Sequence, residues 1–514
     1  MKATIGFAGT LLVLIGALVW TYSKDGAGGA DAKSITVYCA AGMRVPVEAI
    51  KEKYREEFGV QVNLQFGGTG TLLSQIKVAP KGDLFIAADE TAVGAARKAG
   101  IIVEVLPLCH QYPVIAVRAG NPKGVKGLED LFRADLRLAV ANPETASIGK
   151  ATKASLGNRW DELAKKVTVM KTTVTELAGD LSIGAIDAAV IWNSTVPQFK
   201  GIEAIKVPAF SKRLDTVTVS VLRVTESSPS ALKFARYLNA PERGAKIFRE
   251  KGFDAIEGDS WKEKPKLILY SGGVNRPAVE KTLKEFAVRE GVTVETVFNG
   301  CGVLCATMET MKDTANPKYP DAYYACDLCF VPPVAEAFSE AVMLTETIIG
   351  IAVNKGNPKG VKTLADLAKP GVRLGLNNAK QSTLGFMTQG MLRASALEAA
   401  VRKNVVVEGP TADFLIHQMR AGALDAVIVY EVNYKLQEEH LEFLAIDHEG
   451  ARAVQPFSVR GDSDRRLLAS RLLAFLQKNR VRFEESGFRW LEDQTPVKST
   501  ELEIPPWLKQ PQRN

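Results

Sequence analysis

Beyond the N-terminal segment, apolar side chains change their spacing in a way that predicts strands and helices in turn. A short β-rich run at 35–38 is followed by segment 47–58, where apolar residues recur at helical spacing. Segment 60–66 alternates as a strand does, a second helix is expected from Leu72, and residues 84–87 form a short apolar run typical of a buried strand. This order predicts an α/β fold with a mostly parallel sheet flanked by helices.

The same pattern occurs twice in the chain. The string GNPKGVK stands at 120–126 and again at 356–362, followed both times by Leu-x-Asp-Leu. Further matches occur in the same order: Arg44 with Arg276, Phe66 with Phe298, Asp83 with Asp321, Asp89 with Asp327, and 184–188 with 422–426. Ordered matches over this length predict two tandem copies of one module.

The internal repeat and the N-terminal pattern together predict four parts of the chain. Lys2 and the apolar run at 5–20 are typical of an export signal, which is either cleaved or retained as an N-terminal anchor. Either outcome places the body outside the cytoplasm. The predicted parts are a signal peptide or anchor at 1–32, a first module at 33–262, a second module at 263–495 and a C-terminal tail at 496–514.

Composition narrows the possible functions. The chain has 46% hydrophobic and 24% charged residues and a net charge of +7, with Lys and Arg scattered among Asp and Glu. This is typical of ordinary globular proteins and does not indicate nucleic-acid binding. The sequence contains no recognisable catalytic triad, nucleotide loop or zinc-protease string, so we expect a protein that is not an enzyme.

Small and hydroxyl-bearing residues follow the predicted strands of the first copy, where such sheets bind ligands. Helix N-termini at these positions favour an anion, so an oxyanion is the expected ligand. A single loop of this kind is more typical of a helix cap or turn, and only the joint order of the loops favours a site. The candidate residues are Ala41, Gly42, Gly68, Thr69, Gly70, Thr71, Ser147, Ile148 and Trp192.

Together with the string Asp83-Leu-Phe-Ile-Ala-Ala-Asp89, these loops resemble the molybdate-binding proteins of ABC importers, which are type II periplasmic binding proteins. The resemblance covers nearly all of 35–255 and, more loosely, 267–490. It implies two-lobed modules in tandem, each closing on a tetrahedral oxyanion, with molybdate or tungstate as the ligand most in keeping with the family. It also implies delivery of that ligand to an ABC permease in the membrane, without any cofactor.

The resemblance assigns a role to several positions. The family's first-loop serine falls on Gly42, its second-loop hydroxyls on 68–71, its backbone donor near Ile148 and its late tyrosine on Trp192. Gly42 has no hydroxyl and Trp192 donates only through its indole N–H, so the identity of the anion stays open. In the second copy the corresponding ligand positions are Gly273 and Tyr430, and Arg44 and Arg276 are expected to be solvated.

Cysteines distinguish the second copy. Cys301, Cys305, Cys326 and Cys329 lie in two short strings, and Cys301 aligns with Thr69. Because both strings follow adjacent predicted strands, we expect them to be neighbours. Two disulfides, a four-thiolate zinc or iron–sulfur site, and free or redox-active thiols are all open. The alternative function is therefore a metal- or redox-active extracytoplasmic protein, and a sensor that signals by lobe closure is a third class.

The two cysteines of the first copy lie at the end of one predicted strand and the start of another. Cys39 and Cys109 could approach one another in the folded module, but the sequence does not establish it. His110, beside Cys109, has no matched metal-binding partner, so we expect it to pack.

Overall fold

The computed structural model describes residues 34–502 and divides the chain into two compact units. The first unit ends at Ile256 and the second begins at Glu257, except that residues 240–242 belong to the second. The predicted join at 262 lies a few residues further along, and the predicted segment 1–32 lies outside the described residues. Within 34–502, no helix is both long and apolar enough to cross a membrane.

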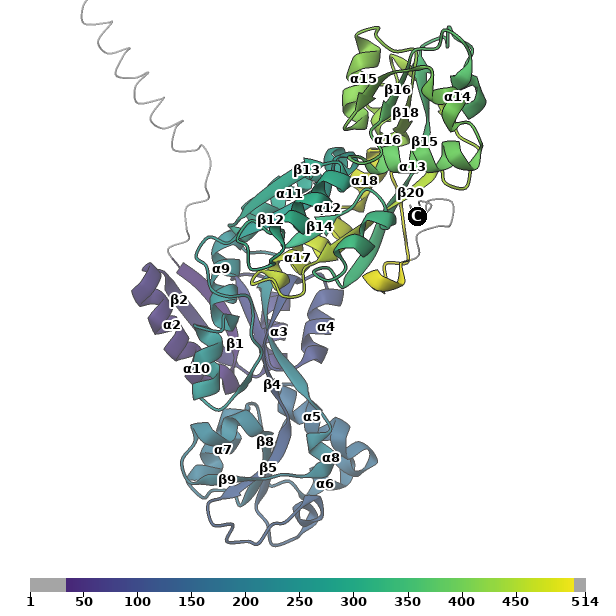
Figure 1. The fold of residues 1–514 in the computed structure, drawn as a ribbon. Helices are drawn as coiled ribbons and strands as arrows, with labels where there is room; N and C mark the ends of the chain where they lie inside the picture. The colour runs from purple at the N-terminus through teal and green to yellow at the C-terminus, as the bar shows by residue number, and fades with distance from the viewer. Residues whose placement is uncertain (1–33, 503–514) are drawn as a thin grey trace, which may run out of the picture. The chain divides into compact units, whose positions relative to one another are not determined.

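The first lobe of the first unit is built on a six-stranded sheet with the order β11-β4-β10-β3-β1-β2 (Figure 1). Its strands are β1 (Ser34–Ala40), β2 (Gln61–Gly67), β3 (Leu84–Ala87), β4 (Ile102–Gln111), β10 (Asp215–Leu222) and β11 (Asp254–Ala255). Strands β1, β2 and β3 are parallel, as predicted, whereas β10 runs antiparallel to β3 and β4. The helices are α2 (Arg44–Phe58), α3 (Thr69–Val78), α4 (Glu90–Lys98), α9 (Ser228–Asn239) and α10 (Gly244–Glu250).

The second lobe contains a five-stranded sheet with the order β7-β6-β8-β5-β9. Its strands are β5 (Pro113–Arg118), β6 (Leu138–Ala141), β7 (Val169–Lys171), β8 (Ala188–Trp192) and β9 (Ile202–Ile205), and its helices are α5 (Ser147–Leu156), α6 (Trp160–Lys166), α7 (Val174–Ser182) and α8 (Pro208–Ser211). The chain enters this lobe after β4 and returns along β10. The outgoing and returning strands therefore run in opposite directions, which makes the sheet of the first lobe mixed.

Local sequence explains these elements well. Helix α2 buries Val47, Ile50 and Tyr54 on one face and ends at Gly59, whose φ of 68° is readily accessible only to glycine. All four residues of β3 are buried, as its continuous apolar run predicts. The predicted helix and buried strand are confirmed.

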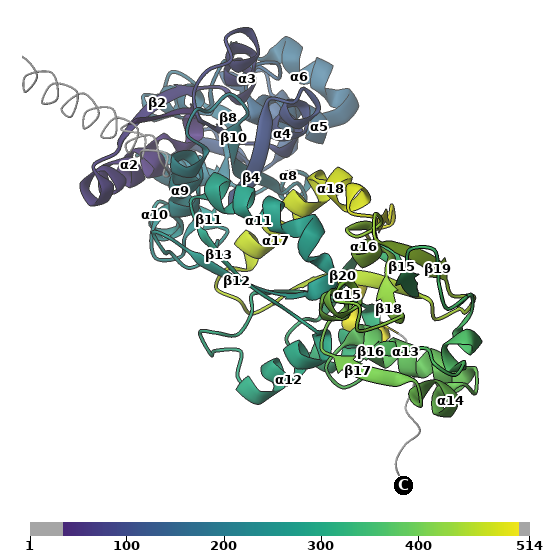
Figure 2. The same cartoon turned by 90° about the horizontal axis from the view of Figure 1, so that it is seen from above.

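The second unit repeats this plan with its strands joined into one eleven-stranded sheet (Figure 2). The main path is β13-β12-β14-β20-β15-β18-β16-β17, and β19, β21 and β22 pair with β15. The strands are β12 (Lys266–Gly272), β13 (Thr293–Asn299), β14 (Ala322–Tyr324), β15 (Glu340–Asn354), β16 (Leu374–Asn377), β17 (Val405–Gly409), β18 (Ala426–Tyr430), β19 (Leu441–Ala445), β20 (Arg452–Val459), β21 (Arg489–Trp490) and β22 (Val497–Lys498). Strand β22 includes residues of the predicted C-terminal tail.

Pro113 explains why the first unit has two separate sheets and the second unit has one continuous sheet. Strand β15 runs unbroken through both lobes, whereas β4 and β5 are interrupted before Pro113, at the position that Ile349 holds in the second copy. Proline has no backbone N–H to donate to the strand ladder.

The helices of the second unit are α11 (Arg276–Glu290), α12 (Cys301–Met311), α13 (Thr383–Ala394), α14 (Glu398–Arg402), α15 (Ala412–Arg420), α16 (Glu431–Lys435), α17 (Arg466–Lys478) and α18 (Arg480–Glu485).

Candidate functional site

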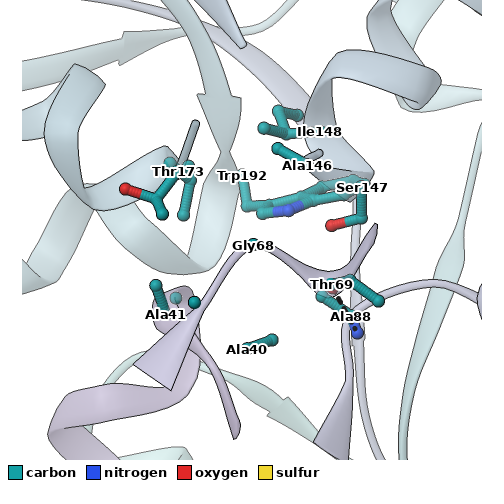
Figure 3. A pocket seen from close by; sticks show the side chains of 13 residues that line it. Ala40, Ala41, Gly68, Thr69, Ala88, Ala146, Ser147, Ile148, Thr173 and Trp192 are labelled. Carbon is teal, nitrogen blue, oxygen red and sulfur yellow. Dashed lines mark hydrogen bonds between the residues drawn. The ribbon is translucent and has the colours of Figure 1, made fainter. Parts of the chain in front are cut away.

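A cleft of about 270 Å³ lies between the two lobes of the first unit. Figure 3 shows residues of the first lobe on one side and residues of the second lobe on the other. The lining consists of Ala40, Ala41, Gly42, Gly67, Gly68, Thr69 and Ala88 from the first lobe, and Ala146, Ser147, Ile148, Thr173, Val174 and Trp192 from the second. Every lining residue is uncharged, so an ion in this cleft would be held by dipoles and hydrogen bonds alone.

Helix N-termini converge on this cleft from both lobes. Helix α3 begins at Thr69, α5 at Ser147 and α7 at Val174, and all three residues line the cleft. The first N–H groups of a helix have no acceptor within the helix, and its dipole is positive at this end. The cleft therefore has positive helix-dipole ends on both of its sides, which suits an anion.

Side chains add hydroxyl donors to these helix ends. The Thr69 hydroxyl accepts a hydrogen bond from the N–H of Ala88 at 3.3 Å, so its own proton is available to a ligand (Figure 3). Ser147 and Trp192 are almost fully buried and border the same space. The indole of Trp192 and both hydroxyls belong to the predicted set.

Two predicted ligand residues have a different role. The N–H groups of Gly70 and Thr71 donate to the carbonyl oxygen of Thr145 in the second lobe, at 2.9 and 3.4 Å. A Cβ at Gly68 would collide with the same carbonyl, so glycine allows the two backbones to meet. Gly70 and Thr71 are not among the lining residues of the cleft, and they join the lobes instead.

Sequence reasoning missed two hydroxyls at this site. Thr173 lines the cleft and caps α7 by accepting the N–H of Glu176 at 3.3 Å, and Thr195 lies beside the cleft. Thr195 lies on the short 3₁₀ segment after β8, fully buried, and its Oγ1 has no hydrogen-bond partner among the described residues. This oxygen lies 3.9 Å from the position that a Cβ would take at Gly42. Thr195 therefore places a hydroxyl near the position where Gly42 lacks one. The only sequence signal was its place three residues after Trp192.

The Asp83–Asp89 string has a structural role. Asp83 accepts the N–H of Thr36 at 2.8 Å, and Asp89 caps α4 by accepting the N–H of Ala92 at 2.8 Å. Burial is the main influence that raises the pKa of Asp89 above its ordinary value. These carboxylates hold the ends of β3 in place, and neither lines the cleft.

The two matched arginines, Arg44 and Arg276, stay at the surface, as expected. The Arg44 guanidinium lies 4.0 Å from the centre of the Phe66 ring and 3.5 Å from the Glu48 carboxylate, and about half of its side chain is exposed. Arg276 has a similar position over Phe298. Neither arginine lines a cleft.

A second cleft, of about 340 Å³, lies between the lobes of the second unit. Gly273 and Tyr430 line it, as predicted, together with Val274, Asn299, Gly300, Cys326, Ser382, Leu384, Pro410, Thr411, Ala412, Asp413 and Asn433. Burial raises the pKa of Tyr430 well above its ordinary value, so its hydroxyl stays protonated. That hydroxyl has no hydrogen-bond partner among the described residues.

The second cleft differs from the first in charge. Asp413 brings a carboxylate to its wall and accepts a hydrogen bond of 3.0 Å from Asn433. The corresponding residues of the first unit are Thr175 and Thr195, both neutral. A fixed negative charge opposes the entry of an anion. The second cleft is therefore less suited to an oxyanion than the first.

Of the four cysteines in the second unit, the structure brings one pair into contact. The sulfur atoms of Cys301 and Cys326 lie 2.9 Å apart, and all six cysteines of the chain are free thiols. The expectation that the two strings are neighbours is confirmed for this pair. Among residues 34–502, no three Cys, His, Asp or Glu side chains are placed to hold a metal ion together.

Cys39 and Cys109 do not approach one another. Cys39 lies on β1 and Cys109 on β4, and strands β3 and β10 lie between them in the sheet. Strands are spaced about 4.8 Å apart, so the two backbones are separated by roughly 14 Å, too far for a disulfide. His110 pairs in the sheet with Thr216 and Asp254.

Comparison with known proteins finds the same module twice. The model of a family described as bacterial extracellular solute-binding protein matches residues 35–254 and again 267–489. A binding protein of Haemophilus influenzae is 27% identical over 226 residues, 43% of this chain and 91% of the relative. The molybdate-binding protein ModA of Escherichia coli is 27% identical over 237 residues, 44% of this chain and 90% of the relative. The solved periplasmic molybdate-binding protein of Azotobacter vinelandii is 18% identical, with a TM-score of 0.37, and covers 43% of this chain and 98% of its own.

Proposed function

Since the chain belongs to the bacterial extracellular solute-binding proteins, which are not enzymes, we propose that its first unit captures a tetrahedral oxyanion of the molybdate or tungstate type. The observation that carries this proposal is the uncharged cleft, where helix N-termini and hydroxyls converge from both lobes. Neutral donors of this kind compensate a buried anion without a fixed counter-charge.

The relatives named for molybdate support this choice of ligand. The unpaired Thr195 hydroxyl supports it independently, because a buried hydroxyl without a partner costs roughly 1–3 kcal/mol and an anion would pair it. In this proposal the protein acts outside the cytoplasm and delivers its anion to the permease of an ABC importer.

Calorimetric titration of the purified chain with molybdate, tungstate, sulfate and phosphate tests the proposal. We expect one bound anion per chain. Replacing Ser147 with Ala should weaken binding by about tenfold or more, since a hydrogen bond to a charged group contributes roughly 1.5–3 kcal/mol. The matched control is Thr383→Ala, at the corresponding position of the second unit, which should leave affinity unchanged. Absence of binding with all four anions would refute the proposal.

A further inference from the structure

Cys301 and Cys326 occupy positions whose geometry the first unit shows with other side chains. In the first unit, Thr69 opens α3 and its Oγ1 accepts the N–H of Ala88, which follows β3, at 3.3 Å. In the second unit, Cys301 opens α12 and its Sγ accepts the N–H of Cys326 at 3.0 Å. The same backbone arrangement thus holds two thiols where the first unit has a hydroxyl and a methyl group.

The surroundings of Cys326 are adapted to its sulfur. A Cβ at Gly272 would collide with the Cys326 Sγ, whereas the corresponding residue of the first unit, Ala40, has a Cβ and lines the first cleft together with Ala88. The absence of a side chain at Gly272 provides the volume that the thiol occupies. A thiol at this position therefore requires both a cysteine at 326 and a glycine at 272.

The separation of the two sulfur atoms favours a covalent bond between them over a shared metal ion. Two thiolates bound to one tetrahedral zinc at about 2.3 Å would lie roughly 3.8 Å apart. The observed separation is 2.9 Å, and a disulfide bond of about 2.05 Å requires the sulfurs to approach by less than roughly 1 Å.

The other two cysteines of the second unit have different neighbours. The Cys305 Sγ lies 3.6 Å from the hydroxyl of Tyr323 and 3.5 Å from the carbonyl oxygen of Phe330. The N–H of Cys329 donates to Asp327 at 3.0 Å, and burial followed by the Asp327 charge raises the pKa of its thiol well above the ordinary value. Cys301 and Cys326 are thus the pair that the fold preorganises.

We propose that Cys301 and Cys326 form a reversible disulfide in the wall of the second cleft, by exchange with an external disulfide. One cysteine thiolate attacks the external disulfide, forms a mixed disulfide and releases one thiol. The second cysteine then attacks the mixed disulfide, forms the Cys301–Cys326 bond and releases the second thiol. The pair loses two electrons and two protons, and the external disulfide gains both as it becomes two thiols.

Access to the cleft and ease of ionisation belong to different members of this pair. Cys326 lines the second cleft, so a small disulfide reaches it from there. Burial by itself raises the pKa of the Cys301 thiol, but hydrogen bonding with Cys326 and Tyr323 outweighs it and lowers that pKa, whereas hydrogen bonding with Cys301 and burial raise the pKa of the Cys326 thiol well above its ordinary value. A lowered thiol pKa increases the thiolate fraction that starts the exchange. The proposal rests on the extracytoplasmic location in the proposed function, where an oxidising environment makes disulfides stable.

The test is disulfide mapping of the full chain. Purified protein is equilibrated with oxidised and reduced glutathione at several ratios, alkylated and analysed as intact protein and as peptides. We expect two of the six thiols to be lost under oxidation, one peptide pair linked through Cys301 and Cys326, and full reversal by reduced glutathione. A link between Cys301 and Cys305, a link between Cys326 and Cys329, or six thiols persisting in excess oxidised glutathione would overturn the proposal.

Variants provide matched controls. Cys301→Ser and Cys326→Ser should each abolish the internal link, whereas Cys305→Ser should retain it. Cys39 and Cys109 are internal controls in the same chain, because burial raises the pKa of both thiols and neither has a sulfur neighbour in the sheet. Anion titration of the same samples separates the two proposals: loss of anion binding with an intact link contradicts only the proposed function.

Discussion

The N–H of Gly70 donates a hydrogen bond of 2.9 Å to the carbonyl oxygen of Thr145, which joins the two lobes of the first unit. The first turn of α3 is therefore divided between two tasks. Thr69 borders the cleft, and Gly70 holds the opposite lobe against it. Capture of a ligand and closure of the lobes depend on the same turn of helix.

Gly70→Ala should impair closure. A Cβ at this position would collide with the carbonyl oxygen of Glu144, so the lobes would have to separate. We expect anion affinity to fall by about tenfold or more, as expected when roughly 1.4 kcal/mol of closure energy is lost, with little change in the unfolding temperature. Calorimetry and thermal unfolding measure the two effects. Gly94→Ala on α4, where a Cβ meets nothing within 4 Å, is the control and should retain full affinity.

Thr195→Val should separate ligand binding from stability. Valine keeps the shape of the side chain and removes a buried hydroxyl that has no partner among the described residues. We expect unchanged or slightly increased stability together with about tenfold weaker anion binding, since a hydrogen bond to a charged group is lost. Thr218→Val removes a similarly unpaired hydroxyl on β10 that is not part of the cleft lining, and it should leave affinity intact. Equal affinities of the two variants would exclude a ligand role for Thr195.

Asp413→Asn should make the second cleft more receptive to an anion. The substitution removes the carboxylate and keeps a side chain that can pair with Asn433. We expect a second, weaker binding event in calorimetry at high anion concentration, where the unaltered chain shows one. If the unaltered chain already binds two anions with similar affinity, charge is not what distinguishes the clefts.

Two homologous ion pairs should make both units sensitive to acid. Hydrogen bonds from the Arg137 guanidinium lower the pKa of Asp187, and those from Arg373 lower the pKa of Asp425. A lowered folded-state pKa stabilises the protein above the unfolded value of about 3.9, and this stabilisation is lost as the pH falls through the folded-state pKa.

Asp187→Asn should therefore destabilise the first unit at neutral pH, by about 1–2 kcal/mol after allowance for the half-exposed arginine, and by less near pH 3. Asp425→Asn should do the same in the second unit. Urea unfolding at the two pH values measures the difference. Glu129→Gln, which breaks a solvent-exposed pair with Arg159, is the control and should have little effect. A loss of stability for Asp187→Asn that is equally large at both pH values would contradict this account.

The sequence alone determined the duplication, the order of strands and helices and most of the cleft. Spacing along the chain reports these features, because a strand or helix that buries one face repeats its apolar residues locally. The loops that line the first cleft were found because they follow strand ends, where small residues and helix N-termini lie at known offsets. Ala41, Gly42, Gly68 and Trp192 were all identified in this way.

Tertiary structure alone decided which members of each loop face the cleft. The roles of Gly70 in the lobe contact and of Thr195 beside Gly42 depend on how residues from opposite lobes meet. Strand order likewise separated Cys39 from Cys109 and brought Cys301 to Cys326. Such contacts join positions far apart in the chain, and local periodicity contains no information about the distance between them.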